Sequence, residues 1–261
     1  MDIGAGTSLG VFGGITAIYF VLRYMLIENY DIINAGGFPH GLSNVLNSVY
    51  FILMTFAQYY INVQNSYTKC GESQIYHSVV YTIIPNVLIF GLLITMLDMF
   101  PGFLKPFSNT IGYFFVYWIG GISSLFNKML VSKEKSRYIQ QVYDDNSMMI
   151  NEITTGKYGN IKQFFQEGSR PGKNQIFNDG YKKFLPKIFN LVVVKDLISK
   201  FIWYILVGGL VISTSFNSIM NMECARSEMT MEKMEKANKA MKEEAEKEAK
   251  QAESQPTEQY F

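Results

Sequence analysis

The longest stretch without a charged side chain limits this chain more than any other feature of its sequence. Residues Ser73–Leu97 contain no Asp, Glu, Lys or Arg over 25 residues. An α-helix rises about 1.5 Å per residue, so about 20 residues cross the roughly 30 Å hydrocarbon core of a bilayer. Uncharged runs also cover Ile3–Leu22, Pro106–Asn127 and Phe201–Met222. We therefore predict an integral membrane protein. The alternative is a soluble helical domain with an unusually apolar core.

The apolar segments predict an all-α, multi-span helical membrane protein with four or five crossings. The segments cover residues 9–27, 42–62, 79–100, 111–126 and 197–220. Segment 42–62 carries several Asn, Ser and Gln, so it spans, packs inside a bundle or lies in the interface. Segment 111–126 is short and aromatic, and either crosses the bilayer or lies flat as an aromatic belt. The predicted parts are a hydrophobic membrane region (1–130), a polar extramembrane region (131–195), a transmembrane helix (196–222) and a Glu/Lys-rich helical tail (223–261).

The charges are concentrated in two polar regions of opposite sign. The whole chain has a formal net charge of +1. Residues 128–196 hold 12 Lys or Arg against 7 Asp or Glu, a net charge of +5, and residues 221–261 hold 7 against 10, a net charge of −3. Basic residues beside membrane helices favour the cytoplasmic side. We therefore expect the central region on the cytoplasmic side and the tail on the other face.

Glycine and proline mark two segments with a predicted structural role. Gly6, Gly10 and Gly14 recur every four residues in the first apolar run, a spacing that lets another helix approach closely. A flexible, glycine-rich N-terminus is the alternative. After the third segment, two prolines and a glycine predict a tight turn at the membrane. The residues of this turn are Phe100, Pro101, Gly102, Pro106, Phe107, Ser108 and Asn109.

The two cysteines connect the number of crossings to the state of a bond. Segments three, four and five lie between Cys70 and Cys224. Three crossings would place the two thiols on opposite faces of the membrane, where they cannot pair. If segment 111–126 lies flat, the thiols share a face, and both a disulfide and two free thiols are compatible with the sequence.

Residues that enzymes and metal sites need are sparse. His40 and His77, the only histidines, have no carboxylate or cysteine cluster at metal-ligand spacing. The sequence "GAGTSLG" lacks the preceding strand and the Gly-Lys-Ser/Thr ending of a phosphate loop. "GISSL" lacks the flanking glycines of a nucleophile elbow. We therefore expect no enzymatic activity, no catalytic residue, no bound metal and no cofactor.

The tail predicts a solvated helix. Pairs such as Glu232–Lys236 and Glu243–Lys247 have the favourable i,i+4 order, each contributing about 0.2–0.5 kcal/mol. A thin apolar stripe offers a partner-binding face as the alternative to a bare solvated helix. The candidates for protein contact are Met231, Met234 and Met241 in the tail and Asn151 and Glu152 in the central region.

Five sequence motifs together form a recognisable pattern. The most specific motif is "FPGFLKPFSNTIGY" at Phe100–Tyr113, preceded by "KCG" at Lys69–Gly71 and "IIPNVLIFGLL" at Ile83–Leu93. The pattern continues in "INEIT" at Ile150–Thr154 and in "VVVKDLISKFIWYILVGGLVISTSFN" at Val192–Asn217, followed by Cys224. These motifs cover about half of the chain, and they resemble a family of membrane proteins from large nucleocytoplasmic DNA viruses of algae and protists.

The resemblance implies a virion component in the membrane beneath an icosahedral capsid, where some members act as minor capsid proteins. The implied function is a structural protein that anchors this inner membrane to the capsid shell. Its partners would be the lipid bilayer and capsid or other virion proteins, with no nucleic acid; a homo-oligomer is compatible. Host membranes would hold it during assembly.

Two other functions are compatible with the sequence. A channel or membrane-remodelling protein would need polar faces of several spans along one pore. Its candidate lining residues are Asn44, Asn47, Gln58, Asn62 and Asn86. A cellular membrane adaptor with a helical partner-binding tail is the other alternative.

Overall fold

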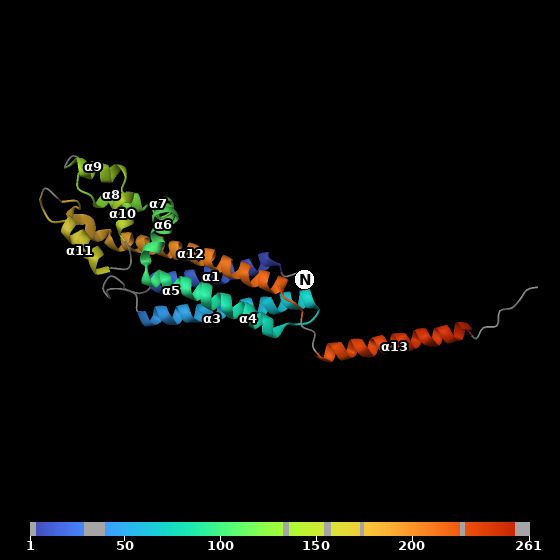
Figure 1. Cartoon of the computed structure of the whole chain (residues 1–261). Coiled ribbons are helices and arrows are strands. Elements are labelled where there is room, and N and C mark those ends of the chain that lie inside the picture. Colours follow the sequence, from blue (N-terminus) through green and yellow to red (C-terminus); the bar gives the residue numbers. More distant parts are fainter. Residues whose placement is uncertain are drawn as a thin grey trace, which may run out of the picture.

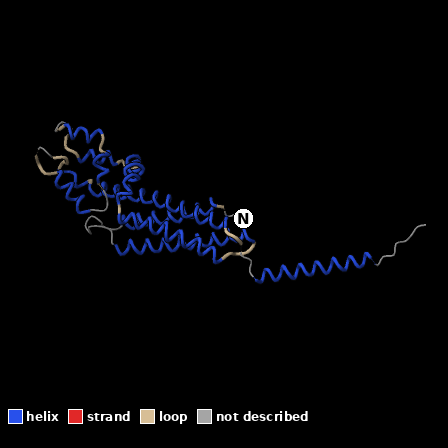
Figure 2. Tube along the Cα trace, viewed as in Figure 1, coloured by secondary structure: helices blue, strands red, loops and turns tan. Residues whose placement is uncertain are grey.

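The computed structural model describes residues 4–28, 40–132, 136–153, 158–172, 175–224 and 228–253. Within these residues the chain is all-helical, as the sequence predicts (Figure 2). Pairing between extended segments of this part is confined to an isolated bridge between Leu130 and Phe177.

Four helical rods lie side by side as a bundle, and consecutive rods run in opposite directions (Figure 1). The rods are α1 (Ala5–Glu28), α3 (His40–Cys70), the continuous rod α4–η1–α5 (Ile75–Pro85, Asn86–Gly91, Leu92–Met99) and α12 (Leu185–Asn221). Among the residues that the structure describes, three stretches are long and apolar enough to cross a membrane: Ala5–Leu26, Ile75–Leu97 and Leu185–Asn221. The structure thus supports a helical protein compatible with membrane insertion.

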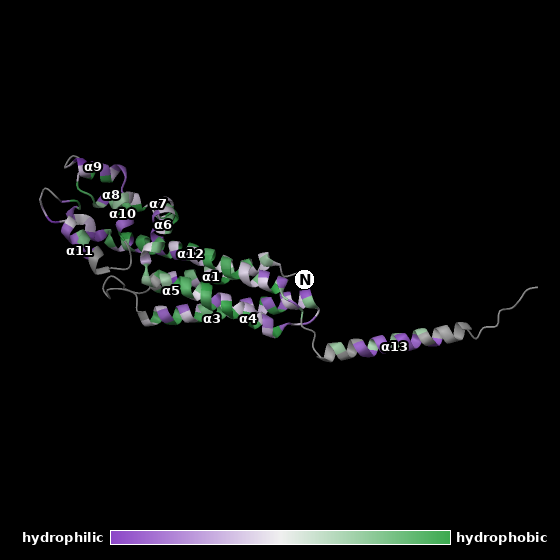
Figure 3. Cartoon of the chain, in the orientation of Figure 1, coloured by the Kyte–Doolittle hydropathy of each residue, from purple (hydrophilic) through white to green (hydrophobic). Residues whose placement is uncertain are grey.

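The helix α3 is amphipathic, with its apolar face outward and its polar face toward the bundle interior. Its outward face exposes Val45, Val49, Ile52, Leu53 and Phe56, while its inward face buries polar side chains. A helix on the surface of a water-soluble protein shows the opposite arrangement. Apolar colouring also dominates the middle of the bundle, whereas the far helix α13 is mainly polar (Figure 3). The surroundings that suit this bundle surface are therefore apolar.

A proline inside the third rod is repaired by the neighbouring helices. Pro85 has no N–H, so the carbonyl of Tyr81, four residues earlier, loses its helical partner. Ser215 of α12 donates its hydroxyl to this carbonyl (2.7 Å). Asn62 of α3 donates to the Ser215 hydroxyl and to Thr82 (2.7 Å each). The wider π-helical turn η1 follows directly, as is common where a helix accommodates such a defect.

The bonds around Pro85 belong to a polar seam that runs through the bundle. Asn86 donates to Gln58 (2.7 Å) and to the Thr82 carbonyl (2.8 Å). Thr16 of α1 shares a hydrogen bond with Tyr50 of α3 (2.9 Å). We call these contacts the interior seam: Thr16–Tyr50, Gln58–Asn86 and Asn62–Thr82–Ser215. It fixes the register of α3 against the other rods, because sliding any rod would leave buried polar groups unpaired.

The central region folds into a small helical unit at one end of the bundle, which we call the cap. It comprises α8 (Ile122–Met129), α9 (Arg137–Asp144), α10 (Ser147–Glu152), α11 (Tyr158–Gly168), η6 (Asp179–Lys183) and the first turns of α12. Its core holds Phe126, Phe165 and Phe177 at 0% exposure. The rings of Phe165 and Phe177 lie 4.7 Å apart. The cap therefore starts before the predicted boundary at residue 130, since Phe126 of α8 belongs to its core.

Segment 111–126 does not form a spanning helix. It is divided among η3 (Ser108–Gly112), α7 (Tyr113–Trp118) and α8, and the chain reverses at Gly121, whose φ is +61°. A helix of six residues is about 9 Å long, far short of a bilayer core. Of the two predicted alternatives for this segment, the structure has the non-crossing one, for which Gly121 supplies the left-handed conformation.

The opposite end of the bundle is closed by Lys69, Cys70 and Cys224. Lys69 donates to the carbonyls of Met220 (2.6 Å) and Met222, and so caps the C-terminus of α12. Cys70 forms a disulfide with Cys224, 154 residues away. Gly71 has φ +74° and ends α3. From this end α13 (Glu228–Glu253) extends away from the bundle (Figure 1).

The predicted glycine stripe on α1 packs against no described residue of this chain. A Cβ added at Gly6, Gly10 or Gly14 meets nothing within 4 Å. The close approach between α1 and α12 is made at Gly208, where an added Cβ would lie 1.9 Å from the ring of Phe12. Whether another protein packs on the stripe stays a prediction.

Replacing Ser215 tests the repair at Pro85. We expect Ser215→Ala to lower the free energy of unfolding in detergent by about 0.5–2 kcal/mol, because the Tyr81 carbonyl and the Asn62 amide lose a buried partner. Ser218→Ala is the control, since the Ser218 hydroxyl bonds only to Thr214 of its own helix (2.9 Å) among the bonds described. Equal losses in both variants would contradict the repair.

Removing the disulfide tests the closure of the other end. We expect Cys70→Ser to lower the free energy of unfolding by about 2–4 kcal/mol, because the long loop between the cysteines is no longer constrained. In the unaltered protein, a maleimide reagent should modify neither cysteine before reduction and both after it. Modification of both thiols without a reductant would rule out the bond.

Candidate functional site

The junction between the cap and the bundle is built around a buried lysine. Lys195 of α12 has 0% exposure. Its ammonium group donates to the carbonyls of Ile150 (3.0 Å) and Ile153 (3.3 Å) of the cap. A buried charge is costly unless it is hydrogen-bonded and balanced. Asp196 and Glu152 supply negative charge beside it.

The end of α10 explains why these carbonyls are available. α10 has only six residues, and the chain becomes extended at Ile153. The last carbonyls of any helix have no partner within that helix, and they carry the negative end of its dipole. Lys195 donates to two carbonyls at this end, those of Ile150 and Ile153, and the Ile150 carbonyl also accepts the Ile153 N–H (3.3 Å). The sequence "INEIT" thus meets "VVVKDLISK" through one side chain.

The third sequence motif packs on the same part of α12. Ser108 of η3 donates to the Asp196 carboxylate (3.3 Å). A Cβ added at Gly112 would lie 2.6 Å from the carbonyl oxygen of Lys195 and 2.9 Å from the Ser199 hydroxyl. Only a glycine therefore lets η3 approach the α12 backbone this closely. Together, Lys195, its two carbonyl acceptors, Ser108, Asp196, Gly112 and Ser199 form what we call the junction.

The predicted membrane turn extends the junction along α12. It forms η2 (Pro101–Leu104), α6 (Lys105–Phe107) and η3. Phe103 stacks on Trp203 with ring centroids 6.4 Å apart, and Phe107 meets the same indole edge-on at 5.9 Å. Phe100, Pro101, Gly102 and Pro106 are exposed, Asn109 is half-buried and Ser108 is buried. The turn is therefore fastened to α12 through its second half and through the two rings on Trp203.

Tyr113 borders the junction and stays neutral. Burial, and to a lesser degree the charges of Asp145 and Tyr117, raises the pKa of its hydroxyl above the usual value. The formal charges of the junction are those of Lys195 and Asp196, and Glu152 lies beside them.

The junction holds the cap and α12 together. The Lys195 ammonium is enclosed and already bonded to two carbonyls, so it is not presented as a nucleophile or base. Within the described ranges, no group of three or more His, Cys, Asp or Glu is placed to hold a metal ion. The junction couples the cap to α12, the longest helix of the bundle.

The other predicted contact residues are separated in space. Asn151 is half-buried and Glu152 exposed, both on α10 beside the junction. Met231 and Met241 are 56% and 60% exposed on α13, and the Met234 side chain lies outside the described residues.

Of the predicted pore residues, Gln58, Asn62 and Asn86 belong to the interior seam. Asn47 bonds Tyr19 and Arg23 instead, and Asn44 is exposed.

Sequence reasoning missed the role of Lys195. The residue reads as a charge that flanks the last transmembrane segment. The signal that distinguishes it is its spacing from Ile188, Val192 and Ser199, which places it in register with the buried face of the helix. A lysine so placed must reach acceptors inside the protein.

Comparisons with known proteins identify no relative: no family model, no curated protein and no solved structure matches this chain.

Replacing Gly112 tests the junction with a matched control in the same motif. We expect Gly112→Ala to destabilise the protein by about 1–3 kcal/mol, because the added methyl group overlaps the α12 backbone. Amide hydrogen exchange should become faster at Ser147–Ile153, because the Ile150 and Ile153 carbonyls of this segment accept hydrogen bonds from Lys195. Gly102→Ala should leave both unchanged, since a Cβ there meets nothing within 4 Å. Unchanged exchange in Gly112→Ala would refute the coupling.

Proposed function

We propose that this protein is a structural membrane protein that anchors the inner membrane of a large DNA virus to its capsid shell. The observation that carries the proposal is the junction, in which a buried lysine and a glycine contact join the cap to α12. A tether must pass force from an extramembrane contact to a membrane anchor without unfolding between them. A continuous 37-residue helix shared by the cap and the bundle meets this need.

The anchor consists of four membrane crossings. Three of them are the apolar stretches in α1, α4–η1–α5 and α12. The fourth is α3, whose exposed face is apolar and whose buried face carries the interior seam. Two of these crossings, α4–η1–α5 and α12, separate Cys70 from Cys224, so both cysteines lie on one face of the membrane, as their disulfide requires. Multiple crossings make insertion effectively irreversible.

Two independent features support one orientation. The cap belongs to the net basic region, which favours the cytoplasmic side. The disulfide lies at the opposite end of the bundle, and disulfides persist on the oxidising side of a cellular membrane. In this orientation the cap faces proteins assembled in the cytoplasm. We therefore assign the capsid contact to the cap, and the acidic tail to the far side.

Many weak contacts suffice for such a tether. Copies arranged under a capsid lattice act together, so the avidity of the array exceeds the affinity of one cap. Glu152 on α10, beside the junction, is exposed and available to a partner. A partner held there would pull directly on the segment that Lys195 binds.

A channel is the competing function, because the interior seam contains polar groups from all four rods. Each of these side chains makes a hydrogen bond to another at 2.7–2.9 Å, whereas Gln58 Nε2 and Asn86 Oδ1 have no partner among the described residues. The cavity beside them, lined by residues that include Ser8 and Gln58, has a volume of about 10 Å³, room for about one water molecule. The seam therefore favours a packed anchor over a conducting pore.

Cross-linking mass spectrometry on intact purified particles tests the tether. We expect amine-reactive links from exposed cap lysines, such as Lys182 and Lys183, to capsid proteins. A Lys182→Arg/Lys183→Arg variant keeps both charges and should lose those links alone. Absence of the protein from particles, or links confined to the protein itself, would overturn the proposal.

Ion flux in liposomes distinguishes the channel. The tether predicts none from the purified protein. Flux that disappears in Asn86→Leu would replace the tether by the channel.

A further inference from the structure

A small cavity lies inside the bundle, where α1, α3 and α12 meet. It has a volume of about 10 Å³, room for about one water molecule. Most of its lining is apolar, as at Met54 of α3 and Ile212 of α12, which are 2% and 3% exposed. Two polar side chains, Ser8 of α1 and Gln58 of α3, complete the lining. The tether proposed above assigns no ligand to this cavity.

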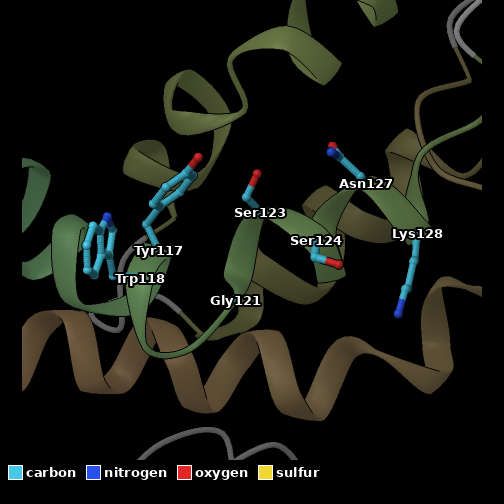
Figure 4. Close-up of a pocket in the computed structure, with 7 residues that line it drawn as sticks. All are labelled: Tyr117, Trp118, Gly121, Ser123, Ser124, Asn127 and Lys128. Carbon is cyan, nitrogen blue, oxygen red and sulfur yellow. The ribbon is translucent and has the colours of Figure 1, made fainter.

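A much larger depression, of about 740 Å³, lies between α7 and α8 but lacks converging polar groups. The polar ends of Tyr117, Ser123 and Asn127 point to one side of it, whereas Lys128 points to another (Figure 4). Its rim is open, since Trp118 is 76% exposed. The small cavity inside the bundle differs in both respects.

Both polar side chains at the small cavity are buried, and each has a polar atom without a partner. Ser8 is 5% exposed and Gln58 6%. The Ser8 hydroxyl bonds to no described residue, and Nε2 of Gln58 is likewise unpaired. Oε1 of Gln58 accepts from Asn86, whose amide also donates to the Thr82 carbonyl (2.7 and 2.8 Å). Exchanging the oxygen and nitrogen of Gln58 would lose the bond from Asn86, so Nε2 is the atom left to donate.

The Ser8 hydroxyl differs from other buried hydroxyl groups of the bundle. Thr16, Thr82 and Ser199 each donate to the carbonyl four residues earlier in the same helix (2.8, 2.6 and 2.6 Å). Ser8 makes no such bond to Gly4 and lies at the cavity instead. A buried polar group without a partner lowers stability, so both Ser8 and Gln58 require a further hydrogen-bonding group at this place.

The size and chemistry of the cavity select water as that group. Apolar cavities stay empty, whereas buried waters occupy cavities that offer two to four polar partners. A water molecule can accept the Nε2–H of Gln58 and donate to the Ser8 oxygen, so both side chains gain a bond. An ion is disfavoured because no charged side chain is among the described residues that line the cavity.

We propose that this cavity holds one ordered water molecule that bridges Gln58 Nε2 and Ser8 Oγ. The water extends the interior seam along α1, because Ser8 precedes Thr16 by about two helical turns. It is a fixed part of the packing, unlike the continuous file of waters in a conducting pore. The inference goes beyond the tether and stands or falls separately from it.

X-ray hydroxyl-radical labelling of the full chain in detergent tests the site, because radicals formed from a buried water oxidise the side chains beside it. We expect Met54, which lines the cavity, to be oxidised several-fold faster than Met129, which is 0% exposed in the cap. Ser8→Ala removes one partner of the water and should slow the oxidation of Met54 several-fold. Thr7→Ala, which removes an exposed hydroxyl from the same helix, should leave it unchanged.

Three labelling results would overturn the inference. Oxidation of Met54 as slow as that of Met129 would mean that no water lies at the cavity. Equal oxidation of Met54 in the unaltered protein and in Ser8→Ala would mean that radicals reach it from the bulk solvent. Comparable labelling of side chains along the whole interior seam would indicate a file of waters.

A double-mutant cycle tests the bridge without radicals. Ser8 and Gln58 make no direct bond to each other, so they affect each other's contribution only through a shared partner. We expect Ser8→Ala to lower the Tm of the unaltered protein but to change it little in a Gln58→Leu background. Equal Tm losses in both backgrounds would contradict the bridge. If Gln58→Leu failed to fold, the labelling of Ser8→Ala would still decide the matter.

Discussion

A hydrocarbon layer offers no hydrogen bonds, so every polar group inside a membrane bundle must find its partner within the protein. In this chain the constraint is sharpest at Pro85, which deprives the Tyr81 carbonyl of its helical donor. The Ser215 hydroxyl replaces that donor, and Asn62 holds the hydroxyl in place. Helices from three parts of the sequence are thereby fixed in one register. The proline, which would weaken an isolated helix, becomes the reason that α3, α4 and α12 pack in a single arrangement.

Lysines close helix ends at two places along α12. Lys69 donates to the last carbonyls of α12 itself, and Lys195, ten residues after the start of α12, donates to the carbonyls of Ile150 and Ile153 at the end of α10. In both places the positive charge of a lysine meets the negative end of a helix dipole. The disulfide adds a covalent bond at the C-terminal end of α12. The helix α12 is thus held at its C-terminus and at the junction, and the segments of the bundle and cap assemble around it.

Composition and run length predicted the all-helical class and the three most apolar helices, because a bilayer imposes a simple length rule. They were ambiguous where polarity is inverted or interrupted. Segment 42–62 looked too polar for a clear assignment, since its Asn and Gln side chains pair with residues more than 20 positions away, as Gln58 does with Asn86. Segment 111–126 was compatible with both a crossing and a flat arrangement, and the reversal of the chain at Gly121 is not evident from its hydropathy. The junction was not predictable from local pattern, because Lys195, Ile150 and Gly112 meet only through tertiary packing.

The length of α12 has a geometric consequence for the cap. Thirty-seven residues extend about 55 Å, whereas a bilayer core takes about 30 Å, so in the proposed anchor roughly 25 Å of the same helix stands clear of the hydrocarbon. The height of the cap above the membrane and its rotation about the axis of α12 are then linked, because each helical residue adds both a rise and a rotation. One added residue within α12 would raise the cap by about 1.5 Å and turn it by about 100°. The face that the cap presents around the membrane normal is therefore set by the number of residues in one helix, and evolution of this helix by insertion must proceed in near-whole turns.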